Sequence, residues 1–144
     1  MAKGKSIADQ AAKLLEQASL KRTTLRLALL QHLIQSKSPC GQMDIIQSLQ
    51  RDLGNVDRVS VYRNLRQLVQ KALVHEVDVN QYIFCEHDCD QHVHLLLFCT
   101  SCGSHQEIRD HKKIAPFVAA LGQFSFFGTD SPISLRGICL KCQG

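Results

Sequence analysis

The chain lacks any long hydrophobic run, internal repeat or segment of low complexity. Even its longest apolar stretches, such as Leu95–Cys99, fall far short of the ~20 residues that a helix needs to cross a bilayer. Residues 1–6 lead into an amphipathic stretch rather than an apolar one, so we expect no secretory signal. The 144 residues are enough for one ordinary core or two small ones. We therefore expect a protein without a membrane among its partners.

The cysteines are not spread along the chain as they are in a secreted disulfide framework. Six of the seven follow residue 84, which indicates intracellular metal chemistry. The charge is also divided unevenly. Residues 1–80 carry 12 Lys and Arg against 7 Asp and Glu, a net +5, whereas residues 81–144 carry 5 against 6, a net −1. A basic first half and a cysteine-rich second half predict two domains with different partners.

Two Cys-x-x-Cys pairs dominate the second half, namely Cys99 with Cys102 and Cys139 with Cys142. Together they supply four thiolates, the number that a closed tetrahedral zinc site requires. The two-residue gap lets both sulfurs of a pair face inward from one tight turn, and Gly103 relieves the backbone directly after the first pair. The alternatives are four buried apolar cysteines or two disulfides, but nothing in the sequence indicates an oxidising compartment.

Apolar periodicity predicts four helices in the first half, followed by a hairpin. The expected helices cover residues 7–20, 25–34, 42–53 and 59–72, and the expected strands cover residues 73–77 and 81–84. Asp57 is expected to cap the fourth helix. This order is typical of a winged helix-turn-helix domain, in which the fourth helix would be the recognition helix.

The second half predicts a smaller α/β domain. Strands are expected at residues 92–98, 105–108, 124–127 and 133–136, and a helix is expected at residues 110–121. Residues 85–91 are polar and without period, so we interpret them as a hinge. The predicted fold class is therefore α+β, with a winged-helix DNA-binding domain at residues 1–84 and a dimerisation and metal-binding domain at residues 92–144. An uncovered sheet edge in so small a domain favours a homodimer.

Four segments together resemble the ferric uptake regulator (Fur) family of repressors. Ser60–Leu65 (SVYRNL) resembles the core of the family's recognition helix, and Arg22–Arg26 resembles its first helical entry. Cys99–Gly103 and Gly137–Gln143 resemble its two zinc knuckles. The resemblance is greatest to the zinc uptake regulator (Zur) branch. It implies a dimeric, metal-activated repressor that binds double-stranded operator DNA in the bacterial cytoplasm, with no small organic substrate.

A regulatory zinc site is expected in addition to the four-cysteine site. His75 ends the predicted DNA-binding domain, Cys85 lies in the hinge, and His92 and Glu107 lie in the second domain. One thiolate, two imidazoles and one carboxylate suit zinc, and the resemblance to the Zur branch implies the same four residues. The alternative ligand to His92 is His94; His87, Cys89 and His105 are also near enough in sequence to contribute.

The number of metal ions follows from two departures from the family pattern. The usual run of histidines before the first knuckle is reduced to His92 and His94. Ser131 stands where a histidine is common in the family. We therefore expect two zinc ions per subunit, one structural and one regulatory, rather than three.

The expected DNA contacts lie early in the fourth helix. Arg63 can bond the O6 and N7 atoms of a guanine, and Tyr62 offers its ring to a thymine methyl group. Ser60, Lys21 and Arg22 are expected to hold phosphates, which position the protein without specifying sequence. Packing against the third helix, or simple solvation, would be the ordinary role of such side chains.

Two other functions fit parts of the sequence. His105-Gln106-Glu107 followed by Cys139-x-x-Cys142 is similar to the signature of zinc nucleoside deaminases, but position 138 is Ile rather than Pro and the first cysteine pair is left without a role. We therefore expect no enzyme. Within the Fur family, a regulator that senses iron, manganese or peroxide is the alternative to a zinc sensor.

Overall fold

The computed structural model describes residues 6–36, 38–86, 95–108, 111–125 and 133–144. The chain divides into two compact units, Met1–Asp88 and Cys89–Gly144, and the boundary falls inside the segment predicted to be a hinge. Both helices and strands are present, so the predicted α+β fold class is confirmed. No helix in the described ranges has the length and apolar character needed to span a membrane.

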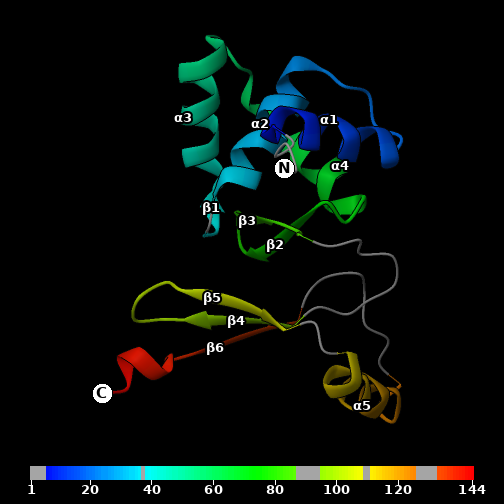
Figure 1. Cartoon of the computed structure of the whole chain (residues 1–144), viewed down its shortest axis with the longest axis vertical. Coiled ribbons are helices and arrows are strands. Elements are labelled where there is room, and N and C mark those ends of the chain that lie inside the picture. Colours follow the sequence, from blue (N-terminus) through cyan, green and yellow to red (C-terminus); the bar gives the residue numbers. More distant parts are fainter. Residues whose placement is uncertain (1–5, 37, 87–94, 109–110, 126–132) are drawn as a thin grey trace, which may run out of the picture. The chain divides into compact units, whose positions relative to one another are not determined.

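The first unit begins with four helices, shown in blue to green in Figure 1. They are α1 (Ile7–Gln17), α2 (Thr24–Gln35), α3 (Gln42–Leu53) and α4 (Arg58–Gln70). A side-chain oxygen caps three of them by accepting a hydrogen bond from a backbone N–H: Ser6 caps α1, Thr23 caps α2 and Asp57 caps α4. Gly54, with φ of 84°, ends α3 in a conformation that few other residues adopt readily. These local signals explain why the helix positions are close to those predicted.

One apolar core holds the four helices together. The core-facing residues of α4 are spaced three and four apart, so they form one stripe along the helix. The buried cluster consists of Ala11, Leu15, Leu29, Leu30, Leu33, Ile45, Ile46, Leu49, Val56, Val61, Leu65, Leu68, Val74 and Tyr82. Because α4 buries one face in this cluster, its opposite face is fixed toward solvent.

A small antiparallel sheet completes the first unit. Its strand order is β1 (Cys40–Gly41), β3 (Gln81–Phe84), β2 (Val74–Asp78). The β2–β3 hairpin is the predicted wing, and its register is irregular between Glu76 and Asp78, next to the turn. The strand β1 was not predicted, because two residues carry too little pattern to indicate a strand.

The second unit is built on a three-stranded sheet, β5 (His105–Ile108), β4 (Leu95–Cys99), β6 (Ile133–Gly137). The strand β5 is antiparallel to β4, whereas β6 is parallel to it. The helix α5 (His111–Gly122) lies between β5 and β6 in sequence, and the short 3₁₀ helix η1 (Leu140–Cys142) follows β6. Because β4 and β6 are parallel neighbours, the segments that leave them emerge at the same end of the sheet (Figure 1).

Some expectations for individual residues are wrong. On α3, a helical stripe through Ile46 and Leu49 also contains Met43 and Leu53. These two residues are 48% and 38% exposed, however, and Ile45 is fully buried. On α5, Phe117 is 53% exposed. The strand predicted at residues 124–127 is a turn where it is described, because Phe124 N–H donates to Leu121 O and continues the end of α5. Residues 126 and 127 lie outside the described ranges.

Candidate metal centre and nucleic-acid interface

The two cysteine pairs lie on tight turns that directly follow two parallel strands. Cys99 is the last residue of β4, and the turn after it is closed by Gly103 N–H, which donates to Cys99 O at 2.9 Å. Gly103 has φ of 71°, which explains the need for glycine there. The second pair follows β6, where Cys142 N–H donates to Cys139 O at 2.9 Å. Each turn therefore presents both of its sulfurs on one side.

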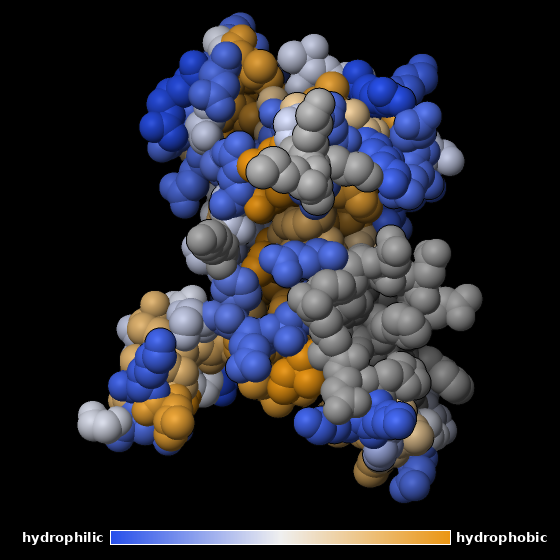
Figure 2. Space-filling view, in the orientation of Figure 1, coloured by the Kyte–Doolittle hydropathy of each residue, from blue (hydrophilic) through white to orange (hydrophobic). Residues whose placement is uncertain are grey.

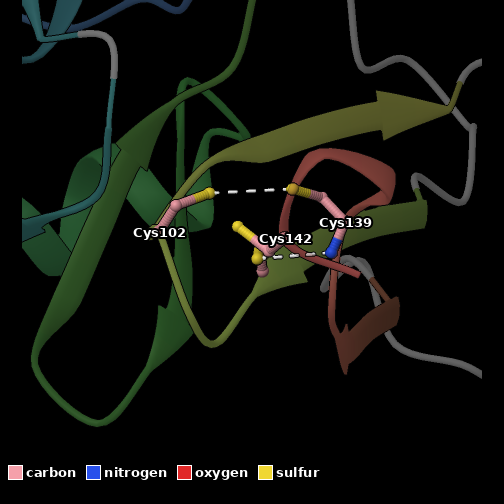
Figure 3. Close-up of side chains that lie close together, drawn as sticks. Cys102, Cys139 and Cys142 are labelled. Carbon is pink, nitrogen blue, oxygen red and sulfur yellow. Dashed lines mark hydrogen bonds between the residues drawn. The ribbon is translucent and has the colours of Figure 1, made fainter. Parts of the chain in front are cut away.

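The four predicted sulfur atoms come together in the second unit. The Sγ atoms of Cys99, Cys102, Cys139 and Cys142 all lie within 4.8 Å of one another, and three of these residues are labelled in Figure 3. Cys102 Sγ and Cys139 Sγ are 3.8 Å apart. Zinc–sulfur bonds of ~2.3 Å in a tetrahedron place the sulfurs about 3.8 Å apart, whereas a disulfide needs ~2.05 Å. All four are free cysteines, so the geometry fits a zinc ion.

Hydrogen bonds from neighbouring groups shift the pKa values of Cys99, Cys102 and Cys142 in different directions. The backbone N–H of Cys139 donates to Cys99 Sγ at 3.3 Å and, with other backbone groups, lowers the pKa of Cys99 to about 6. A hydrogen bond of 3.0 Å with Ser104 Oγ lowers the pKa of Cys102. Hydrogen bonds with Cys139 and Cys102 instead raise the pKa of Cys142 to about 12. A divalent cation would compensate for bringing four thiolates together and would displace the remaining protons.

The predicted regulatory ligands are described in part. His75 lies on β2, opposite Ile83 of β3, and is buried. Cys85 follows β3, is also buried, and its backbone N–H donates to Leu73 O at 3.0 Å. The ligand atoms of His75 and Cys85 lie within 4.8 Å of one another. The wing hairpin thus brings an imidazole and a sulfur side by side at its base.

The other candidates for the regulatory site are placed as follows. Glu107 lies on β5 in the second unit and is half-buried. His92 lies outside the described residues, as do His94, His87 and Cys89. His105 packs its ring against Phe98, with ring centroids 6.1 Å apart.

Cys85 is disulfide-bonded in this structure. Among the described residues, Cys40 and the four clustered cysteines are free. A thiolate rather than a disulfide sulfur is the ligand for a zinc ion. Cys85 can therefore contribute to a metal site only after reduction, a condition that sequence reasoning did not reveal.

The start of the predicted recognition helix is well anchored. Asp57 Oδ2 accepts hydrogen bonds from the backbone N–H and from the hydroxyl group of Ser60, both at 2.9 Å. These bonds lower the pKa of Asp57. Because the hydroxyl group of Ser60 donates to Asp57, it has no second proton with which to reach a phosphate. Ser60 is thus the hydrogen-bond partner of the Asp57 cap, and its predicted phosphate contact stays a prediction.

The solvent-facing side of α4 carries the predicted base-reading residues. Tyr62 is 41% exposed and Arg63 is exposed, while the opposite face of the helix is buried in the core. The guanidinium carbon of Arg66 lies 5.7 Å from the centroid of the Tyr62 ring, a cation–π contact that steadies the ring. Val59 is 53% exposed on the first turn of α4. Sequence reasoning missed Val59, although an apolar residue early in a basic helix was a possible signal for a thymine-methyl contact.

The two predicted phosphate contacts near α2 are both exposed. Arg22 forms an ion pair of 2.8 Å with Glu16 of α1, in which both side chains are more than half exposed. The carbonyl oxygen of Lys21 accepts a hydrogen bond of 2.7 Å from Arg26, which fixes the backbone but leaves the Lys21 ammonium group exposed. An exposed ion pair of this kind is weak, so Arg22 can exchange Glu16 for a phosphate.

A hollow of about 370 Å³ separates α4 from the wing. Tyr62 and Arg66 line it from α4, and Glu76 and Tyr82 line it from the hairpin. Burial, with the nearby Glu76 carboxylate, raises the pKa of Tyr82 to about 12, so this phenol stays neutral. The hollow therefore presents hydrogen-bonding groups from the helix and from the wing on one surface.

Comparison with known proteins identifies the family. The model of the ferric uptake regulator family matches residues 17–124, most of the chain. The chain belongs to the ferric uptake regulator family. This family consists of transcription regulators rather than enzymes. The peroxide-responsive repressor PerR of Staphylococcus aureus (strain Mu50 / ATCC 700699) is 25% identical to this Fur-family chain over 134 residues, which cover 90% of this chain and 86% of PerR.

Solved structures show the same fold. A zinc uptake regulator complexed with zinc and DNA matches this Fur-family member with a TM-score of 0.80 at 23% identity, covering 99% of this chain and 97% of that one. Holo XcZur matches with a TM-score of 0.79 at 23% identity, covering 96% of this chain and 97% of that one. The Helicobacter pylori ferric uptake regulator matches with a TM-score of 0.59 at 19% identity, covering 96% of this chain and 93% of that one. The resemblance to the family is confirmed, and the fold is shared with solved zinc uptake regulators.

Proposed function

We propose that this chain is a zinc-responsive repressor, which binds the operators of zinc-uptake genes as a metal-loaded homodimer. The observation that carries the proposal is the pair of donors at the base of the wing. His75 and Cys85 place an imidazole and a sulfur within 4.8 Å, on the first strand of the hairpin and directly after the second. A thiolate ligand favours zinc over iron(II) or manganese(II), which prefer nitrogen and oxygen ligands.

The two metal sites would have different roles. The four cysteines would hold a structural zinc ion, because a closed four-thiolate site leaves no open position for a substrate or water. His75 and Cys85, joined by Glu107 and His92, would hold the regulatory ion. These ligands come from both units, so a bound ion would cross-link them and favour one arrangement of the DNA-reading helices. Such a preference for one arrangement is what allows a ligand to shift a population.

The second unit also supports the homodimer. Three large apolar side chains around β6 and η1 are exposed in the single chain: Leu135 by 52%, Ile138 by 51% and Leu140 by 86%. Figure 2 shows hydrophobic residues on the surface of the second unit near the C-terminus. The same residues line a hollow of about 480 Å³ beside the sheet. An exposed apolar patch next to a sheet edge is typical of an interface, and a second copy would cover it.

The test is fluorescence-anisotropy binding to a dyad-symmetric operator, with free zinc, iron(II) or manganese(II) set by metal buffers under reducing, oxygen-free conditions. We expect tight binding that begins at a very low free zinc concentration. Cys85→Ser should abolish the zinc dependence. Cys40→Ser is the matched control, because Cys40 is a free cysteine of the same unit outside both metal clusters. Zinc-dependent binding that survives Cys85→Ser would refute the assignment of the regulatory site.

A second candidate function is peroxide sensing, which is favoured by the 25% identity to the peroxide-responsive repressors of Staphylococcus aureus. In that case iron(II) or manganese(II), rather than zinc, should activate DNA binding, and peroxide should abolish it in the iron-loaded protein. The same titration distinguishes the two candidates. A deaminase-like activity is disfavoured, because Cys99 and Cys102 join the other two cysteines in one cluster and His105 packs against Phe98.

A further inference from the structure

Arg26 connects the start of α2 to the recognition helix. Its Nε–H donates to Asn64 Oδ1 at 2.9 Å, and its Nη2 donates to Gln67 Oε1. Its Nη1 donates to the carbonyl oxygen of Lys21 at 2.7 Å. All three nitrogen atoms of the guanidinium group are therefore bonded to oxygen atoms of the protein. The guanidinium group donates from three separate nitrogen atoms in a fixed plane, to acceptors on α4 and just before α2, whereas lysine donates from a single nitrogen atom.

The two side chains that Arg26 holds lie one turn apart on α4. At about 100° per residue, Asn64 and Gln67 lie on the flank between the core-facing stripe and the face that carries Tyr62 and Arg63. Asn64 also donates from Nδ2 to Ser60 O at 2.8 Å, which ties the same flank to the first turn of the helix. These contacts oppose rotation of α4 about its own axis.

A small rotation of α4 would misplace the base-reading groups. Side chains on a helix extend about 5–6 Å from its axis, so a 10° rotation displaces their outer atoms by about 1 Å. A bidentate bond between Arg63 and a guanine depends on the direction of both donors, and a displacement of this size weakens it. The apolar core also restrains α4, but apolar contacts are less directional than hydrogen bonds.

We propose that Arg26 is a positioning residue, which sets the rotation of the recognition helix, and that it is not one of the phosphate contacts. This proposal rests on the proposed DNA-binding function. The alternative, a phosphate contact, would be the usual role of an arginine in a basic DNA-binding domain. Arg26 differs from the exposed Arg22 because it is half-buried and its donors are already bonded to Lys21, Asn64 and Gln67.

Salt dependence separates the two roles. A phosphate contact contributes to the binding of every duplex, and its loss reduces the slope of log K against log salt by about 1. A positioning residue affects the operator only, and its loss leaves the slope unchanged. The variant Arg26→Lys keeps the positive charge but loses the fork, so it alters positioning while preserving the charge available to a phosphate.

The experiment measures anisotropy for an operator duplex and a scrambled duplex of equal length, over a series of salt concentrations, with the zinc-loaded full chain. For Arg26→Lys we expect about a tenfold loss of operator affinity, unchanged affinity for the scrambled duplex and an unchanged salt slope. Gln67→Ala removes one acceptor from the opposite side and should show a smaller loss of the same kind. Arg51→Ala, which removes an exposed charge from α3, is the control and should leave the operator preference intact.

The possible results are distinct. Full operator affinity in Arg26→Lys would overturn the positioning role, and so would an equal loss on both duplexes in Arg26→Ala with a reduced salt slope. Circular dichroism and the urea midpoint of each variant establish that the loss of preference is not a loss of folding. If the unaltered chain shows no operator preference, the proposed DNA-binding function fails instead, and the positioning role fails with it.

Discussion

Removal of the metal should unfold the second unit and leave the first unit folded. Among the described residues of the second unit, the buried apolar side chains are Leu96, Cys99 and Ile114. The first unit, in contrast, has a core of fourteen buried residues. A small unit with so few buried side chains depends on another source of stability, and the four clustered sulfurs supply one.

The expected loss of stability follows from comparing the free energy of apolar burial with the free energy of zinc binding. Burial of Leu96 and Ile114 stabilises the unit by about 1.5–3 kcal/mol for each side chain. A structural four-ligand zinc site contributes ~10–16 kcal/mol, which is comparable to the ~5–15 kcal/mol that stabilises a whole ordinary domain. Loss of the metal should therefore shift the folding equilibrium of the second unit fully toward the unfolded state. None of the four clustered cysteines belongs to the core of the first unit, so the stability of that unit should change little.

Hydrogen exchange with mass spectrometry measures this directly. The protein is treated with a strong chelator under reducing conditions, and loss of zinc is verified by native mass spectrometry. We expect peptides from β4 and β6 to lose their protection and those from α2 and α4 to keep it. Cys139→Ser should reproduce the effect without a chelator, whereas Cys40→Ser should not. Protected amides in β4 and β6 after complete metal removal would refute the reasoning.

Four further predictions concern single residues. Leu65 is fully buried on α4, so the substitution Leu65→Ala should lower the free energy of unfolding by about 2–5 kcal/mol, as measured by urea denaturation. A decrease of less than about 1 kcal/mol would contradict the place of Leu65 in the core. Arg63→Ala should reduce discrimination between an operator and a single-base variant by about 1–3 kcal/mol, whereas equal losses on all duplexes would mark Arg63 as a phosphate contact. Burial lowers the pKa of His32 below its ordinary value of 6.5, so the neutral form is favoured in the folded state. The first unit should therefore lose stability as the pH falls from above 6.5 toward the lowered pKa, and His32→Gln should flatten this dependence in urea midpoints measured between about pH 5 and 8. Because Cys85 is disulfide-bonded, the second equivalent of zinc should bind after treatment with a reductant and not before; isothermal titration with and without reductant tests this, and two equivalents in the oxidised protein would contradict it.

Local signals explain what the sequence predicted well. The helix α3 lies where it was expected, because Gly41 and Gly54 bound it, and α4 begins directly after the predicted cap, Asp57. The four-cysteine cluster was predicted for a similar reason. The two-residue spacing within each pair is a local property, and the requirement for four ligands then links the two pairs across the intervening residues.

Features that depend on contacts between distant residues were not predicted. The strand β1 exists because Cys40 pairs with Tyr82 of β3, and nothing in two residues indicates such pairing. Ile45 is buried in place of Met43 because the packing of α3 against its neighbours, and not its periodicity alone, selects the inner face. The bonds from Arg26 to α4 likewise join residues 38 and 41 positions apart.

The parallel pairing of β4 and β6 raises a question of alignment. Four of the five residues of β6 are exposed, so burial alone specifies poorly which residue of β6 pairs with which residue of β4. The two strands end together, with Cys99 opposite Gly137, and Cys139 lies two residues further on. A slip of one residue would move Cys139 by about 3.3 Å along the sheet, nearly the full sulfur–sulfur spacing of a tetrahedral site. Metal binding by the cysteine cluster thus selects the register of β6 against β4, because all four sulfurs can hold one metal ion in the correct register and not in a slipped one.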